Sequence, residues 1–258
     1  MQTKIRVGAV SYLNTKPLIY GFENGLMAEK VELKIDFPSS IASMLLDDKI
    51  DIGLVPVAIL PEMKEYHIIS DYCIGCDGAV ASVCLFSEVP LNKIEKILLD
   101  YQSRTSVELL KILIKDHWKI APVFEETYGN YQSNISGTTA ALVIGDRALA
   151  QRKISAYIYD LGLEWQNFTG LPFVFAAWIS NKKLDDDFIE SFNKATSFGL
   201  DKIEQIVCNN FYPFFSLHDY YTKYISYVLD KRKQEGLQLF LDKLPVKNPN
   251  AKLVSPEF

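Results

Sequence analysis

The 258-residue chain has no excess of positive charge and no long apolar run. Its 27 basic and 32 acidic residues give a net charge of −5. This balance argues against a nucleic-acid-binding protein, because such proteins normally carry a basic face. No apolar stretch reaches the ~18 residues that a membrane-spanning helix needs. We therefore expect neither a nucleic-acid partner nor a membrane partner.

An export signal is also missing. The opening residues MQTKIRVGAVSYLN have no apolar core and no small-residue cleavage site. We therefore expect a cytoplasmic protein, whose four cysteines (Cys73, Cys76, Cys84 and Cys208) are reduced thiols. The composition, 48% apolar and 23% charged residues, is that of a globular chain that can bury one core or two smaller ones.

The usual catalytic motifs are absent. The chain contains no G-x-G-x-x-G, no P-loop and no G-x-S-x-G elbow. None of its three histidines (His67, His117 and His218) follows a predicted strand, so we expect structural roles for them. The pair Cys73 and Cys76 has C-x-x-C spacing, but no second pair completes a zinc site and no helix follows. We predict a turn with two small thiols there.

Short strands and helices alternate along the chain. Apolar runs predict strands at 4–10, 31–37, 51–56, 79–86, 96–100, 141–144 and 173–179. Helical patterns follow most of them, and the chain is mostly helical after Asp185. This alternation predicts an α/β protein with a mostly parallel sheet covered by helices.

The plan of strand, polar loop and helix occurs in both halves of the chain. VGAVSYLNTKPLI and KILLDYQSRTSVELL share it, and so do DIGLVPVAIL and ALVIGDRALA. We predict two lobes joined by two crossings: residues 1–86 begin lobe 1, 87–181 form lobe 2, and the helical segment 182–258 returns to lobe 1. Ligands bind at the carboxyl ends of strands in such sheets, so we expect a cleft between the lobes.

Small polar residues gather at the predicted strand ends. Each one alone is typical of a helix N-cap, and Asn14 is a candidate cap for a helix containing Pro17. Together, their hydroxyls and the helix N-termini behind them predict a site for a carboxylate-bearing small molecule. These residues are Ser11, Asn14, Ser39, Ser40, Ser103, Thr105 and Ser106.

Three other features leave alternatives open. Ser82 lies in a predicted strand and faces either the core or the cleft. Asp146 and Arg147 form either a charged pair at the cleft rim or an exposed helix start with a surface arginine. The aromatic run between Tyr212 and Tyr227 has helical spacing, which favours packing of the C-terminal helices over a ligand site.

Residues 10–18 (VSYLNTKPL) resemble the N-terminal signature of the chorismate dehydratase family, which acts in menaquinone synthesis through futalosine. Any one such block is weakly specific, but the order and spacing of the whole set over residues 5 to 180 are specific. The other matching blocks are 51–56 (DIGLVP), 78–83 (GAVASV), 103–106 (SRTS), 141–149 (ALVIGDRAL), 160–162 (DLG), Trp165 and 169–173 (TGLPF).

The resemblance implies a two-lobed fold like that of type II periplasmic binding proteins, and a lyase that needs no metal or cofactor. Its substrate would be chorismate, which loses water to give 3-[(1-carboxyvinyl)oxy]benzoate. We expect Asn14 and Ser82 to be catalytic. The expected substrate-binding residues are Ser11, Ser39, Ser40, Ser103, Thr105, Ser106, Gly145 and Asp146.

The expected cleft offers no histidine, and Asp146 is the one nearby charged candidate, so we predict that the substrate's own enolpyruvyl carboxylate removes the C3 proton. The competing view is that Asp146 is the base. Two other functions stay open. One is a solute-binding protein for small carboxylates, although such proteins normally carry an export signal. The other is 1,4-dihydroxy-6-naphthoate synthase, a related family with a catalytic histidine after the strand equivalent to 141–144. This chain has Gly145 and Asp146 there, which counts against the synthase. The sequence does not determine the oligomeric state.

Overall fold

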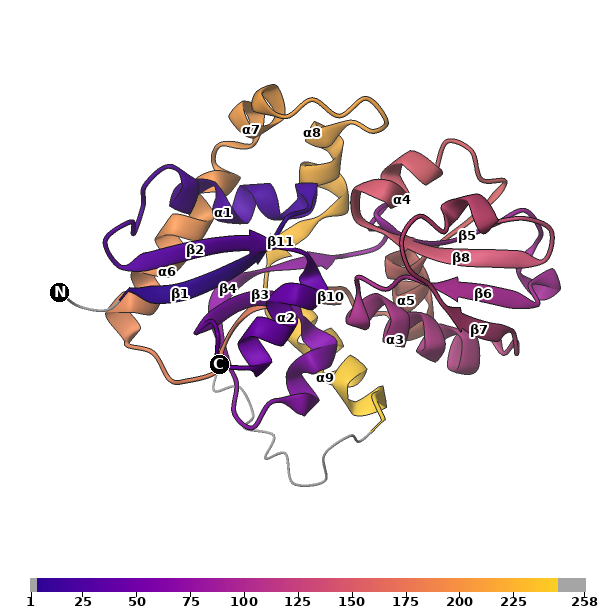
Figure 1. Cartoon of the computed structure of the whole chain (residues 1–258), viewed down its shortest axis with the longest axis horizontal. Helices are drawn as coiled ribbons and strands as arrows, with labels where there is room; N and C mark the ends of the chain where they lie inside the picture. Colours follow the sequence, from indigo (N-terminus) through magenta and orange to yellow (C-terminus); the bar gives the residue numbers. More distant parts are fainter. Residues whose placement is uncertain (1–3, 246–258) are drawn as a thin grey trace.

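The first of two sheets contains strands from both ends of the chain. The computed structural model describes residues 4–245. The strand order in this sheet is β11-β4-β10-β3-β1-β2. Figure 1 shows it on the left, beside the second lobe. Its strands are β1 (Ile5–Val10), β2 (Val31–Asp36), β3 (Ile52–Pro56), β4 (His67–Cys76), β10 (Phe173–Ser180) and β11 (Ser226–Val228).

Helices from the two ends of the chain surround this first sheet. The six-residue 3-10 helix η2 (Val57–Glu62) follows β3, as the sequence predicted for a helix there. The first lobe's α-helices are α1 (Lys16–Glu23), α2 (Pro38–Leu46), α6 (Asp186–Leu200), α7 (Ile203–Asn209), α8 (Leu217–Asp219) and α9 (Lys231–Lys243), and the π-helix η6 (Tyr220–Tyr224) follows α8.

The second sheet is formed by the middle of the chain, in the order β7-β6-β8-β5-β9. Its strands are β5 (Val83–Ser87), β6 (Lys96–Leu99), β7 (Val123–Glu126), β8 (Thr139–Ile144) and β9 (Tyr157–Asp160). Its helices are α3 (Arg104–Ile112), continued by the π-helix η4 (Leu113–Trp118), α4 (Gly145–Gln151) and α5 (Leu161–Thr169).

Two connections join the lobes, as expected, but the strands divide differently from the boundaries at 86/87 and 181/182. The first connection lies between β4 and β5, so β5 pairs with β8 and β9 in the second sheet. The second leads from α5 to β10, which pairs with β3 and β4 in the first sheet. An apolar strand carries no mark of the sheet it joins, so these boundaries could not be placed from the strand pattern. Residues 246–258 of the predicted C-terminal segment lie outside the described part.

Both sheets are mixed rather than mostly parallel. β1 pairs in parallel with β2 and β3, but β10 is antiparallel to both of its neighbours. In the second sheet, β5 is antiparallel to both β8 and β9. The cause is the exchange of chain between the lobes, because a strand that enters a sheet from the other lobe can run in either direction.

Two local predictions are wrong. Cys73 and Cys76 lie in β4 rather than in a turn, and Cys76 pairs with Phe173. Asn14 lies inside a 3-10 turn, Leu13–Thr15, and Thr15 occupies the N-cap position of α1 without a side-chain cap. The residues from Cys73 to Cys76 are buried in a strand, so they do not form the predicted turn. The 3-10 turn before α1 includes Asn14, so Asn14 does not occupy the N-cap position of that helix.

The predicted cap at Ser103 is confirmed, whereas Ser39 and Ser40 lie inside α2, whose N-cap position is Phe37. Ser103 caps α3 by accepting from the Ser106 N–H at 3.2 Å. Asp185 caps α6, and the acidic run there lies at the helix N-terminus, where negative charge is favourable. None of the helices in residues 4–245 is long and apolar enough to cross a membrane.

Candidate active site between the lobes

A cavity of about 490 Å³, its mouth included, lies between the two lobes. Its wall is mostly apolar, and its polar side chains are neutral. The lining residues are Val10, Tyr12, Asn14, Pro38, Pro56, Ile74, Val80, Ser82, Val83, Ser103, Ser106, Ile144, Gly145, Phe175 and Ala176. The expected cleft therefore exists, and five of the ten predicted site residues line it.

The two predicted catalytic residues lie on a shared tyrosine. The Tyr220 hydroxyl donates to Ser82 Oγ at 2.7 Å, and the Asn14 side chain hydrogen-bonds to the same hydroxyl. The Asn14 backbone is held as well, since its carbonyl accepts from the Tyr227 hydroxyl at 3.0 Å. Tyr220 is fully buried, and burial raises its pKa well above the usual range, so it stays a neutral donor.

The Ser82 hydroxyl keeps its own proton available. Tyr220 supplies the hydrogen bond that Ser82 Oγ accepts, and the alternative acceptor for the Ser82 proton, the Val80 carbonyl, lies at the long distance of 3.5 Å. The backbone of Ser82 is held because its carbonyl accepts from the Gly145 N–H at 2.8 Å. Ser82 can thus donate to a group in the cavity.

Helix α3 begins at the cavity wall. Ser103 and Ser106, which both line the cavity, are joined by a 2.8 Å hydrogen bond between their hydroxyls. First-turn N–H groups of a helix have no intrahelical partner, and the helix dipole adds a partial positive charge there. This end of the cavity can bind an anionic group, because two hydroxyls line it and α3 begins there.

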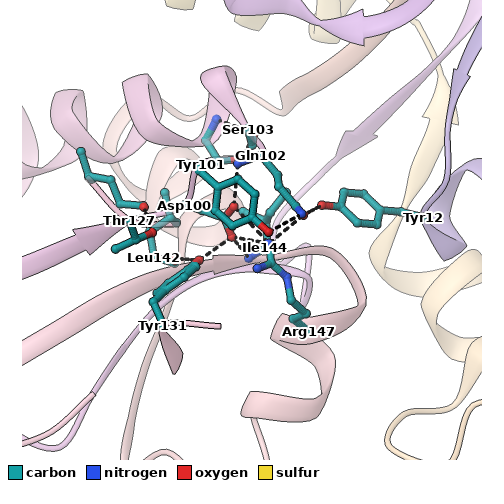
Figure 2. A network of polar contacts seen from close by, with 12 residues as sticks. Tyr12, Asp100, Tyr101, Gln102, Ser103, Thr127, Tyr131, Leu142, Ile144 and Arg147 are labelled. Atoms are coloured by element: carbon teal, nitrogen blue, oxygen red, sulfur yellow. Dashed lines mark hydrogen bonds and ion pairs between the residues drawn. The ribbon is translucent and has the colours of Figure 1, made fainter. Parts of the chain in front are cut away.

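Tyr12 links the cavity wall of the first lobe to the second lobe. Its hydroxyl donates to Gln102 Oε1, which also accepts from Arg147 Nη2 at 2.8 Å (Figure 2). The Tyr12 ring packs on Gly145, since a Cβ added there would lie 3.1 Å from the ring. The cleft is therefore held closed by side chains from both lobes.

The cation nearest this network is neutralised within the second lobe. Arg147 contacts both Asp100 oxygens, at 3.1 and 2.8 Å, and the Asp100 side chain is fully buried. Asp100 also accepts from the Tyr131 hydroxyl at 2.5 Å and from the Ile144 N–H at 3.2 Å (Figure 2). Neither sequence interpretation of Arg147 is correct. Arg147 pairs with Asp100 instead, and neither residue lines the cavity.

The Asp146 carboxylate binds a backbone N–H of the first lobe and lies outside the cavity lining. Its Oδ1 accepts from the Leu13 N–H at 3.1 Å, another contact between the lobes, and its carbonyl accepts from the Tyr212 hydroxyl. Burial raises the pKa of Asp146 to about 6, partly offset by the Leu13 N–H and by the positive charge of Lys16. The carboxylate therefore holds the loop that carries Tyr12 and Asn14.

Four other predicted residues also lie outside the cavity lining. Thr105 is buried, and its Oγ1 accepts from the Ala58 N–H of the first lobe at 3.1 Å. Ser40 donates to Asp36 at 2.8 Å, while Ser39 accepts from the Ser43 hydroxyl through its carbonyl. Ser11 is exposed, and its N–H donates to the Asp36 carbonyl. Of these four, Thr105 contributes to the contact between the lobes.

Gly145 has a backbone conformation that residues with a side chain rarely adopt. Its φ of +64° lies in the left-handed region, and the Tyr12 ring covers the position that a side chain would need. A catalytic histidine at this position would require both a different backbone and a displaced Tyr12. The sequence argument against the naphthoate synthase therefore has a structural basis.

Sequence reasoning missed Tyr220, Tyr12, Gln102 and Asp100. Tyr220 stood in an aromatic run whose spacing favoured packing, and packing is what most of its neighbours do. Asp100 carried a usable signal, since it is a charged residue directly after an apolar strand, β6. Within residues 4–245, no group of three His, Cys, Asp or Glu side chains is placed to hold a metal ion.

Comparison with known proteins decides the family. A family model described as menaquinone biosynthesis matches residues 5–245. The chain belongs to this menaquinone biosynthesis family. Among curated relatives, the chorismate dehydratase of Thermus thermophilus is 26% identical over 220 residues, which cover 78% of this chain and 79% of the relative. The resemblance read from the sequence blocks is thereby confirmed.

Solved structures confirm the fold of this family member. A protein from Archaeoglobus fulgidus has a TM-score of 0.72 at 12% identity, covering 93% of this chain and 96% of its own. The periplasmic aliphatic sulphonate binding protein SsuA from Escherichia coli has a TM-score of 0.58 at 13% identity, covering 94% and 93%. At such identities the likeness shows the two-lobed, periplasmic-binding-protein-like fold alone.

Proposed function

We propose that this protein dehydrates chorismate to 3-[(1-carboxyvinyl)oxy]benzoate. The observation that carries the proposal is a cavity between the lobes whose polar groups are neutral donors, Asn14, Ser82, Ser103 and Ser106, in a chain that resembles a chorismate dehydratase. The reaction needs little more than such donors. The C3 proton is acidified through the ring diene and carboxylate, and loss of the C4 hydroxyl makes the ring aromatic.

The α3 end of the cavity suits one carboxylate of the substrate. Ser103 and Ser106 offer hydroxyls there, and the first-turn N–H groups stabilise negative charge. The remaining donors, Asn14 and Ser82, both hydrogen-bond to the Tyr220 hydroxyl. In this proposal they hold the enolpyruvyl carboxylate or the departing hydroxyl.

The base in this proposal is the substrate's enolpyruvyl carboxylate. It takes the C3 proton while the C4 hydroxyl leaves, and that proton and hydroxyl together account for the water released. Among residues 4–245, no carboxylate or imidazole lines the cavity, which supports this assignment. The protein contributes placement and hydrogen bonds that strengthen as charge moves.

The test is incubation of the purified protein with chorismate. We expect a new aromatic product that retains the enolpyruvyl group and whose mass is lower by one water. An analogue with the enolpyruvyl carboxylate replaced by an amide should bind but not dehydrate. Normal turnover of that analogue would exclude the substrate-assisted step. Binding of chorismate without any product would instead favour a solute-binding protein.

A further inference from the structure

The residue before Ser82 has an unusual backbone. Ala81 has a φ of +62°, in the left-handed region that side-chain-bearing residues rarely adopt. It belongs to the first connection between the lobes, where the Ser82 N–H turns back to the Val80 carbonyl at 2.8 Å. Strained residues persist only where their surroundings hold them, and they cluster at functional sites. The contacts that hold the Ala81 backbone therefore also set the direction of the Ser82 side chain.

Both peptide groups of Ala81 are held by one ion pair. Asp160 Oδ2 accepts from the Ala81 N–H at 2.8 Å, and Asp160 Oδ1 accepts from the Val80 N–H at 3.0 Å. On the other side, Arg152 Nη1 donates to the Ala81 carbonyl at 3.4 Å. Arg152 and Asp160 lie 3.8 Å apart, and the Asp160 side chain is 7% exposed.

We propose that Asp160, with Arg152, is a positioning residue that holds Ala81 in its left-handed turn and thereby directs Ser82 into the cavity. The proposal rests on the proposed function in one respect, that Ser82 acts on the substrate. Asp160 does not line the cavity, so it acts on catalysis through the segment that it holds, Val80 to Ser82. Ser82 lies at the end of the first connection between the lobes, and Asp160 is the last residue of β9 in the second lobe.

The packing around Asp160 fits this role. Asp160 also caps α5, accepting from the Gly162 and Leu163 N–H groups at 3.1 and 3.3 Å. Gly162 lets the start of α5 lie close to the first connection between the lobes, because a Cβ there would come within 2.7 Å of the Gly78 carbonyl oxygen. The sequence Asp-Leu-Gly at 160–162 thus combines a carboxylate, a helix start and a close approach.

If Asp160 were only a helix cap, its removal would not change the position of Ser82. Asp185, which caps another helix, provides the control. Asp185 caps α6 by accepting from the Asp187 and Phe188 N–H groups at 3.0 and 3.2 Å, without contacting the connection between the lobes. Asp160→Asn and Asp185→Asn remove the same capping carboxylate from two helices. In Asp160→Asn, the new NH₂ group must face at least one of the four N–H donors that the carboxylate accepts.

The experiment measures kcat and KM for chorismate in these variants and in Ala81→Gly backgrounds. We expect Asp160→Asn to lower kcat at least about tenfold with KM within about threefold, because the loss of a well-placed donor acts on the transition state. Ala81→Gly in the same chain should restore kcat to within about threefold of the wild type, since glycine adopts the turn without being held. Asp185→Asn should keep the wild-type kcat.

Arg152→Gln keeps the proposal testable if Asp160→Asn fails to fold. It should lower kcat several-fold and be rescued in the same way by Ala81→Gly. Equal effects of Asp160→Asn and Asp185→Asn, or no rescue of either positioning variant by glycine, would overturn the proposal.

A measurement without substrate separates this proposal from the proposed function. Amide hydrogen exchange of Val80 and Ala81, followed by NMR, should accelerate at least about tenfold in Asp160→Asn and stay unchanged in Asp185→Asn. Unchanged exchange in Asp160→Asn would contradict the clamp. If the wild-type protein fails to dehydrate chorismate, the proposed function fails, and these exchange rates still decide whether Asp160 holds the turn.

Discussion

The Tyr220 hydroxyl donates a hydrogen bond to Ser82 Oγ at 2.7 Å, although 138 residues separate the two in the chain. Tyr220 belongs to η6 of the first lobe, and Ser82 lies at the end of the connection into the second. The same phenol contacts Asn14, so a buried tyrosine orders both polar groups proposed to act on the substrate. The bond forms where the two lobes meet, which couples the order of the site to closure of the cleft.

Removal of these donors should abolish most turnover. Asn14→Ala and Ser82→Ala should each lower kcat by about 10²- to 10³-fold, as the loss of an oxyanion-hole donor does. Tyr220→Phe should lower kcat less, because it leaves the Ser82 hydroxyl in place without its orienting donor. Steady-state kinetics with circular dichroism as the folding control checks these values. Wild-type turnover in Ser82→Ala would remove Ser82 from the mechanism.

Asp146→Asn should retain most activity, because the Asp146 carboxylate lies outside the cavity lining and binds the Leu13 N–H, which an amide oxygen can also do. Kinetics at several pH values checks this. Loss of the reaction in Asp146→Asn with an intact fold would instead make Asp146 the leading candidate for a protein base.

The same substitution should change how stability depends on pH. Burial raises the Asp146 pKa from 3.8 to about 6, so the folded protein binds more protons than the unfolded chain between these values. The stabilisation from this group is present below pH ~4 and is lost as pH rises through about 6. At 1.36 kcal/mol per unit, Asp146→Asn should gain up to about 3 kcal/mol over the wild type between pH 4 and pH 8. Urea unfolding of both proteins at the two pH values measures this, and parallel curves would contradict the assignment.

Thr105 and Ser106 should both affect binding, by different routes. Thr105→Val keeps the shape but leaves the Ala58 N–H without its acceptor in the closed cleft, which should disfavour closure by about 1 to 3 kcal/mol. Ser106→Ala removes a hydroxyl from the cavity wall itself. Calorimetric titration with the reaction product should show weaker binding in both. Unchanged affinity in the double variant would show that this end of the cavity does not hold the carboxylate.

The cysteines should prove to be packing groups. Burial raises the pKa of the Cys73 thiol to about 12 and that of Cys76 well above its usual range, so neither forms a reactive thiolate at neutral pH. In the native protein a thiol reagent should react quickly with Cys208, which is exposed, and slowly with the other three. The Cys73→Ala/Cys76→Ala variant should keep turnover within a few-fold, with no stoichiometric zinc in either protein. Bound metal that tracks activity would contradict this.

Local sequence patterns predicted much of the secondary structure. The strands at β1, β3, β6 and β10 follow from apolar runs bounded by polar residues, and the Ser103 cap follows from a hydroxyl at a helix start. These features depend on residues that are neighbours in the chain. The family resemblance rests on the same kind of information, short blocks in a fixed order, and it led to the correct fold and family.

Only the tertiary structure decided which of the polar residues face one cavity. Thr105 and Ser106 are adjacent, yet one hydroxyl binds the first lobe and the other lines the cleft, because successive helical side chains point about 100° apart. Tyr220 belongs to the site and Asp146 lies outside the cavity lining because of contacts between the lobes, which no local sequence pattern indicates. The sequence by itself determined most of the strands, the Ser103 cap and the family. The directions of the side chains at the cleft depended on how two separately formed sheets close against each other.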